Sequence, residues 1–258
     1  MRRRTRRLVV LGILAGLLSG CAYLSRPGKA TLLFDEAHGQ RFLIGQQGRL
    51  DLSSFGDVAR DEGLLVEANR EELSDRALAR AAALVVSGPF APLTPAEVEA
   101  TLRFLDRGGR LAVMLHIGPP AAALLDALGV DVSNGVIRER ENVINDDPLN
   151  FRVTRLAPHE LTEKLAGFDA FGVWALRNMS TDAAIIARTS ERSWVDLNGN
   201  HTLDERDGAQ SFGVAVAGTR GKGRFVVFGD DAIFQNEFLA GDNLTLARNL
   251  ARWFVRAR

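Results

Sequence analysis

Residues 81–115, AAALVVSGPFAPLTPAEVEATLRFLDRGGRLAVML, contain two apolar runs with an amphipathic segment between them. The runs at residues 83–87 and 110–115 have the length and composition of buried strands. In the intervening Thr94-Pro95-Ala96-Glu97, the threonine is placed to cap a helix, the proline suits the first helical position, and the glutamate completes a capping box. The stretch therefore predicts a strand, a helix and a second strand.

The same alternation of apolar runs and helical segments extends over most of the chain. Further strands are expected at residues 30–34, 64–67, 212–217 and 224–228, and helices at residues 53–61, 73–80 and 242–256. Short apolar runs that alternate with helices are typical of parallel sheets. We therefore expect an α/β fold whose mainly parallel sheet is flanked by helices on both faces.

The middle of the chain, residues 134–211, is more polar and less periodic, with strand-like runs at residues 172–176 and 184–187. We expect it to form an irregular, β-rich insertion within one domain that spans residues 30–258. The glycine-rich residues 218–223 lack the spacing of a phosphate-binding loop and predict a hairpin turn.

The first twenty residues have the three parts of a secretory signal. A basic head precedes an apolar run that is shorter than the ~20 residues needed to cross a bilayer. The following Leu18-Ser19-Gly20-Cys21 resembles the lipobox of bacterial lipoproteins, which implies cleavage before Cys21 and its modification with acyl chains such as palmitate. Ala22 favours the periplasmic face of the outer membrane in a Gram-negative cell, and residues 21–29 would form a tether. The alternative is an N-terminal membrane anchor that is never cut.

The composition of the chain excludes several classes of function. Cys21 is the only cysteine, so the domain after it has no disulfide, no thiolate metal site and no cysteine nucleophile. Without the five arginines of the signal, 27 basic residues face 32 acidic residues, a net charge near −5. This charge balance argues against nucleic acid as a ligand, because phosphate contacts need clustered Lys and Arg.

Three stretches, residues 33–42, 221–231 and 241–253, resemble a bacterial domain of unknown function that is related to the auxiliary component of gliding-motility ABC transporters. The resemblance implies the fold of class I glutamine amidotransferases, which is also described as flavodoxin-like. Enzymes of that fold use a cysteine on a strand-to-helix turn, and the corresponding residues 116–119 hold none. The resemblance thus implies a non-catalytic binding or assembly module, associated with a transporter or another envelope complex.

Polar residues follow several expected strands, and ligands bind beyond the carboxyl ends of parallel strands. The candidates for ligand binding are Asp35, His38, Asp230 and Asp231. The alternative function is a hydrolase or metal-dependent enzyme that uses Asp35, His38 and Asp230 as acid, base or ligands. Against both stands a structural interpretation, in which these residues only shape turns and cap short segments.

Other polar residues carry weaker signals. His116 follows the run at residues 110–115, and His159 lies in the irregular segment, and a structural role is the stronger interpretation for each alone. Ser87 and Ser211 raise the possibility of a serine hydrolase, but neither lies in a G-x-S-x-G motif.

Residues 196–207, DLNGNHTLDERD, resemble the calcium loops of EF-hands and dockerin-like repeats. Oxygen ligands fall at alternate positions, so that a tight loop could surround one calcium ion. Two features depart from the pattern: His201 stands where glycine makes the sharp turn, and an aspartate replaces the final glutamate. The alternative is a polar hairpin without an ion. The ligands expected are Asp196, Asn198, Asn200, Thr202, Asp204 and Asp207.

Overall fold

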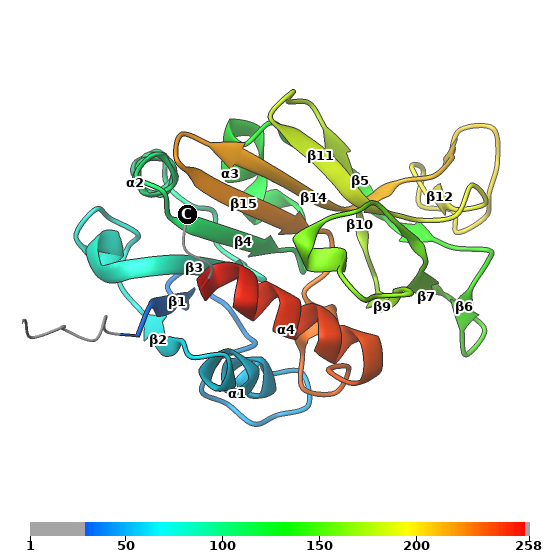
Figure 1. Ribbon diagram of the computed structural model, residues 1–258. Helices are drawn as coiled ribbons and strands as arrows, with labels where there is room; N and C mark the ends of the chain where they lie inside the picture. Colours follow the sequence, from blue (N-terminus) through cyan, green and yellow to red (C-terminus); the bar gives the residue numbers. More distant parts are fainter. Residues whose placement is uncertain (1–28, 256–258) are drawn as a thin grey trace, which may run out of the picture.

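The computed structural model describes residues 29–255, which contain one large mixed sheet, one small sheet and four α-helices (Figure 1). The strands are β1 Thr31–Asp35, β2 Leu65–Asn69, β3 Ala81–Ser87, β4 Arg110–Met114, β5 Val130–Arg138, β6 Val143–Ile144, β7 Asp147–Val153, β8 Arg155–Leu156, β9 Phe168–Phe171, β10 Trp174–Asn178, β11 Ala183–Arg188, β12 Trp194–Val195, β13 Gly208–Ala209, β14 Gly213–Arg220 and β15 Gly223–Phe228. The helices are α1 Ser53–Asp61, α2 Pro95–Asp106, α3 Ala122–Ala127 and α4 Gly241–Val255. The expected signal, Cys21 and most of the expected tether lie outside the described residues.

The large sheet has two halves that differ in strand direction. Its strands follow the order β13-β12-β5-β10-β14-β15-β4-β3-β1-β2, and β11 and β8 branch from β14. From β2 to β15 every neighbouring pair is parallel, whereas from β15 to β13 every pair is antiparallel. Strands β6, β7 and β9 form the small antiparallel sheet.

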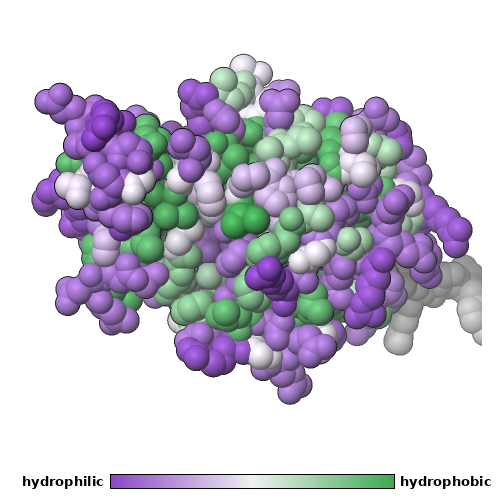
Figure 2. Space-filling view, turned by 180° about the vertical axis from the view of Figure 1, so that it is seen from behind, coloured by the Kyte–Doolittle hydropathy of each residue, from purple (hydrophilic) through white to green (hydrophobic). Residues whose placement is uncertain are grey.

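Strands β1, β3, β4 and β15 of the parallel half are largely buried on both faces, because successive side chains point to opposite sides of a sheet, whereas the edge strand β2 is partly exposed. In β1, Leu32 and Phe34 belong to a core shared with α1 and α4, whereas Leu33 belongs to a second core shared with α2 and α3. Figure 1 shows α1 and α4 together on the near face of this half. On the far face, hydrophobic and hydrophilic residues are interspersed (Figure 2).

The expectation of a mainly parallel α/β sheet of the class I glutamine amidotransferase-like or flavodoxin-like type is wrong. The fold is rich in sheet, with 12 strands in one mixed sheet and only four α-helices among residues 29–255. Short apolar runs do not reveal strand direction, so β10, β11 and β14 were indistinguishable from parallel strands in the sequence. The helix expected at residues 73–80 is also wrong: this segment forms only a 3₁₀ turn, Ala77–Arg80.

Several local predictions are confirmed. Helix α1 has the expected bounds, and α2 begins after Thr94 with the expected capping box. The turn before β15 joins β14 and β15 as a hairpin. Between residues 29 and 255, no helix is both long and apolar enough to cross a membrane.

Candidate functional site

Four parallel strands, β1, β3, β4 and β15, end at the same edge of the large sheet. Open parallel sheets bind ligands at this edge. Six of the side chains singled out from the sequence lie there. In spatial order they are Asp230 and Asp231 after β15, His116 after β4, Ser87 at the end of β3, and Asp35 and His38 at the end of β1.

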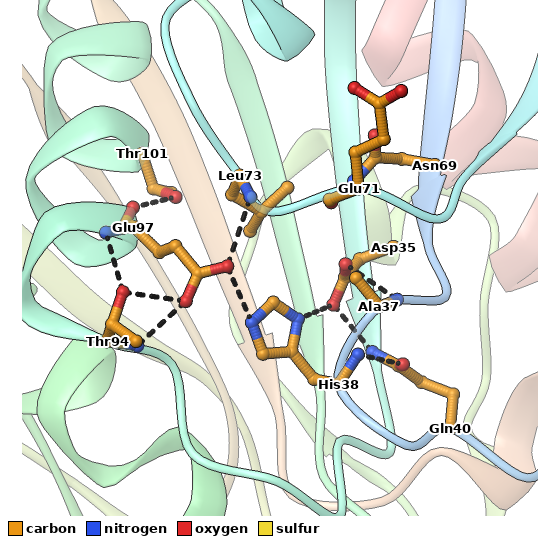
Figure 3. A network of polar contacts seen from close by, with 10 residues as sticks. All are labelled: Asp35, Ala37, His38, Gln40, Asn69, Glu71, Leu73, Thr94, Glu97 and Thr101. Atoms are coloured by element: carbon orange, nitrogen blue, oxygen red, sulfur yellow. Dashed lines mark hydrogen bonds and ion pairs between the residues drawn. The ribbon is translucent and has the colours of Figure 1, made fainter.

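His38 lies in the interior between two carboxyl groups (Figure 3). Its Nδ1 is 2.7 Å from Asp35 Oδ2, and its Nε2 is 2.9 Å from Glu97 Oε1. His38 is only 5% exposed, and Asp35 and Glu97 are 3% and 4% exposed. We call Asp35, His38 and Glu97 the His38 clamp. The sequence assigned Glu97 only to the capping box, because no local pattern reveals a contact with a residue 59 positions away.

The two acidic residues of the His38 clamp have further partners. Glu97 Oε2 accepts hydrogen bonds from the backbone and hydroxyl of Thr94, at 2.9 and 2.8 Å, and Oε1 accepts one from Leu73 N at 3.1 Å. Asp35 Oδ2 accepts a bond from Gln40 Nε2 at 2.6 Å. The clamp is therefore saturated with hydrogen bonds supplied by the protein itself.

Burial alone would lower the pKa of His38. The hydrogen bonds and charges of Asp35, and then those of Glu97, outweigh burial and raise this pKa from 6.5 to about 9. For Glu97, burial is likewise opposed by the hydrogen bonds from Thr94 and His38, which lower the pKa of the carboxyl group. At neutral pH the clamp therefore holds a buried imidazolium ion.

The His38 clamp also fixes two loops. The carbonyl oxygen of His38 accepts hydrogen bonds from Phe90 N and Ala91 N, both at 2.9 Å, which ties the loop after β1 to the loop after β3. In the first loop, Gln40 Oε1 accepts a bond from His38 N at 2.7 Å. Residues next to Gln40 and Phe90 are thus held in place by the buried clamp.

Asp230 is occupied by capping bonds. Its Oδ2 accepts a bond from Phe171 N at 2.7 Å and its Oδ1 one from Ala232 N at 2.8 Å. Burial, followed by the charge of Asp231, raises the pKa of Asp230 well above its usual value. Two strands separate β15 from β1, so Asp230 lies about 14 Å from Asp35 along the sheet edge. The structure therefore does not bring Asp35, His38 and Asp230 together at one point.

His116 and Asp231 form a second histidine–carboxyl pair at this edge. His116 Nδ1 is 3.2 Å from Asp231 Oδ1, and the aspartate side chain is 1% exposed whereas that of the histidine is 38% exposed. The hydrogen bond to Asp231 raises the pKa of His116, against the opposing effects of burial and of the charge on Arg41. Burial raises the pKa of Asp231, and the hydrogen bond and charge of His116 limit the rise. The sequence named both residues but gave no sign that they meet.

The remaining polar candidates are His159, Ser211 and Ser87. His159 Nδ1 accepts a bond from Leu161 N at 3.1 Å and caps a 3₁₀ turn, and burial lowers its pKa. Ser211 Oγ donates a hydrogen bond to Thr189 O at 2.8 Å, in the segment between β13 and β14. Ser87 Oγ is buried and has no hydrogen-bond partner among the described residues. None of these residues forms a nucleophile–base pair in the described part of the chain.

The loop at residues 196–207 is closed by its own side chains. Asp196 accepts bonds from Gly199 N at 2.7 Å and His201 N at 2.8 Å, and Asp207 accepts them from Leu197 N and Asp204 N. His201 has a left-handed φ of 60°, as the position of the usual glycine requires.

The acidic side chains of this loop do not converge on one point. Asp204 pairs with Arg206 Nη2 at 2.8 Å, and this bond is the largest of several that lower the pKa of Asp204. Asn200 Nδ2 donates to the same carboxylate at 2.8 Å. Among residues 29–255, no group of three or more His, Cys, Asp or Glu side chains is arranged to hold a metal ion. Calcium binding by the loop stays a prediction.

A family model described as a domain of unknown function, DUF4350, matches residues 49–251, which is most of the chain. The chain belongs to the DUF4350 family. The expected resemblance to a domain of unknown function is confirmed at this level. The matched part of this DUF4350 protein contains Glu97, His116 and Asp231, whereas Asp35 and His38 precede it. No curated protein matches the sequence of the DUF4350 protein.

Several solved structures are similar to the DUF4350 protein. The N-terminal domain of mmIFT52 has a TM-score of 0.70 and 18% identity, and the match covers 88% of this chain and 98% of that one. A ThuA-like protein from Bacteroides uniformis ATCC 8492 has a TM-score of 0.52 and 17% identity, covering 92% and 95%. A cytoplasmic protein from Salmonella typhimurium LT2 has a TM-score of 0.55 and 15% identity, covering 88% and 97%. At these identities the likeness shows the fold alone.

Proposed function

We propose that the chain is an extracytoplasmic lipoprotein, anchored to the membrane through Cys21, that acts as a non-catalytic binding or assembly module. Its partner would be a protein of the cell envelope, such as an ABC transporter. The lipobox-like Leu18-Ser19-Gly20-Cys21 supports the anchor. Several acyl chains on one cysteine anchor a protein durably, whereas a single chain binds only marginally.

The saturation of the His38 clamp carries the non-catalytic part of this proposal. A general acid or base needs a nitrogen or oxygen that reaches the substrate. In His38 both ring nitrogens bond to buried carboxyl groups, and in Asp230 both carboxyl oxygens cap backbone amides. These bonds suit the stability of the sheet edge rather than proton transfer to a substrate.

The alternative enzyme would need Asp35, His38 and Asp230 around one pocket. The separation of about 14 Å along the edge between Asp35 and Asp230 argues against that arrangement. We therefore favour the binding module over a hydrolase or metal-dependent enzyme built on these three residues.

Metabolic labelling with a fatty acid, followed by membrane fractionation, tests the anchor. Cys21→Ser should abolish acyl labelling and either release the protein from membranes or leave an uncut precursor. Ser25→Ala, four residues further on, should be labelled and retained like the unchanged protein. A Cys21→Ser protein that is still acylated and processed would overturn the lipoprotein assignment.

A further inference from the structure

The exposed side of His116 is framed by two aromatic rings and a cation. The ring of Phe42 lies 5.0 Å from the imidazole, centre to centre, and that of Phe90 lies 5.4 Å from it. The guanidinium of Arg41 is 4.4 Å above the ring of Phe90. Arg41 forms no ion pair with any residue in the described part of the chain, so its charge is not neutralised by a carboxylate there.

The orientation of the His116 ring is set by its hydrogen bond to Asp231. Its Nδ1 bonds to the buried Asp231, which directs Nε2 away from the sheet, and no described residue bonds to Nε2. Backbone bonds from Gly88 N to Met114 O and from Asp231 N to Leu115 O, both 2.8 Å, hold the three neighbouring strand ends in register. At Gly88 a Cβ atom would come within 2.6 Å of Asp231 Oδ2, so glycine is needed for this close approach.

Two buried polar atoms beside His116 lack partners within the described residues. They are Ser87 Oγ and Asp231 Oδ2, on the strand ends that flank β4. Buried polar atoms are nearly always hydrogen-bonded. Ser87 Oγ carries a proton that it could donate to an acceptor, whereas Asp231 Oδ2 is itself an acceptor and does not contribute to the binding of an anion. The His38 clamp, whose polar atoms are saturated, is the contrasting arrangement along the same edge.

We propose that His116 and Arg41 form a binding site for a phosphate-type oxyanion, with Phe42 and Phe90 as its apolar walls. The outward-facing polar groups are donors: the Nε2–H of a protonated His116 and the planar fork of Arg41, which suits phosphate oxygens. The carboxyl group of Asp231 faces inward and supports the imidazolium form, as its hydrogen bond raises the pKa of His116. The assignment rests on the proposed binding role and does not depend on the lipid anchor.

The His38 clamp acts as the support of this site. It fixes Gln40 and Phe90 through bonds at His38 N and His38 O, and so places the two loops that carry Arg41, Phe42 and Phe90. His38 and its acidic partners are positioning residues in this scheme, because they contact the loops and not the oxyanion.

Histidine-labelled full-length protein in detergent tests the site by NMR, with the four imidazole signals assigned by single substitutions. Inorganic phosphate should shift the His116 signals in a saturable way and raise the apparent pKa of His116, leaving His159 and His201 unchanged. Arg41→Gln should weaken phosphate binding roughly tenfold, and His116→Gln should abolish it. Arg49→Gln is the matched control, because Arg49 lies on the same loop but pairs with Glu237.

No saturable shift at His116, an equal shift with chloride at the same ionic strength, or unchanged affinity in Arg41→Gln would overturn the site. Vesicles of phosphatidylglycerol and of phosphatidylcholine distinguish the sources. Arg41-dependent binding to the anionic vesicles indicates a lipid headgroup, and binding of free phosphate alone indicates a soluble ligand. Hydrolysis of a phosphate ester that is lost in His116→Gln would overturn the non-catalytic function while it confirms the oxyanion site.

Discussion

Single side chains at the carboxyl edge of the sheet fall into two groups by the number of partners that they have. His38 bonds to carboxyl groups through both ring nitrogens and is buried. His116 bonds through Nδ1 alone and is partly exposed. Both histidines follow apolar strands, so the sequence alone does not separate a supporting residue from one that can meet a ligand.

The first prediction concerns His38 and pH. Because the pKa of His38 in the folded chain, about 9, lies above its usual 6.5, the His38 clamp stabilises the fold fully below pH 6.5. That stabilisation, on the order of 3 kcal/mol, is lost as the pH rises through about 9. Urea unfolding at about pH 6 and about pH 10 should show the loss in the unchanged protein.

His38→Ala leaves two buried carboxyl groups without their shared partner and should cost about 3–5 kcal/mol near neutral pH. Its stability should also depend less on pH over the alkaline range. Met179→Ala is the control, since Met179 is 62% exposed. Equal stability of His38→Ala and the unchanged protein at about pH 6 would contradict the ionic role of the clamp.

Among the elements of the fold, the loop at residues 196–207 joins β12 to β13. Both Gly199 and His201 adopt left-handed φ values, 74° and 60°. A histidine in that region is strained by roughly 1–3 kcal/mol relative to glycine. The loop keeps this conformation through bonds from backbone amides to Asp196 and Asp207.

The second prediction is that millimolar calcium raises the melting temperature of chelator-treated protein, and magnesium less so. An ion that binds only the folded form stabilises it by roughly 1.4 kcal/mol at ten times its dissociation constant. Asp196→Ala should remove the response, whereas Glu205→Gln, at a position that is not an expected ligand, should keep it. Identical melting curves with calcium and with chelator would show that the loop is only a polar connection.

At the scale of the whole molecule, the parallel and antiparallel halves of the large sheet meet at β15. Gly229 follows β15, donates its N–H to Val214 O at 2.9 Å, and accepts a bond from Trp174 N at 2.8 Å. These bonds tie β15, β14 and β10 together beside the His116 site. At Gly229 a Cβ atom would lie only 2.1 Å from Trp174 O.

The third prediction is that Gly229→Ala destabilises the fold by at least about 2 kcal/mol, because the clash is with backbone and overpacking typically costs 1–3 kcal/mol. Denaturant unfolding gives the change in free energy. Gly45→Ala is the control, since a Cβ atom there meets nothing within 4 Å and should change stability little. A Gly229→Ala protein as stable as the control would show that the two halves can shift apart without penalty.

The sequence by itself determined the local elements. The capping box of α2, the bounds of α1 and the hairpin before β15 follow from interactions between residues a few positions apart. Such interactions are encoded in adjacent side chains, so their pattern can be read from the chain. The lipobox-like residues 18–21 are local in the same sense, and their assignment stays a prediction.

Only the tertiary structure decided strand direction and the partners of the polar side chains. An apolar run has the same composition in a parallel and an antiparallel strand, so the mixed sheet was not foreseen. The pairs His38–Glu97 and His116–Asp231 join residues 59 and 115 positions apart. Which donor meets which carboxyl group, and whether a histidine supports the fold or faces a ligand, depends on where the folded backbone brings the strand ends together.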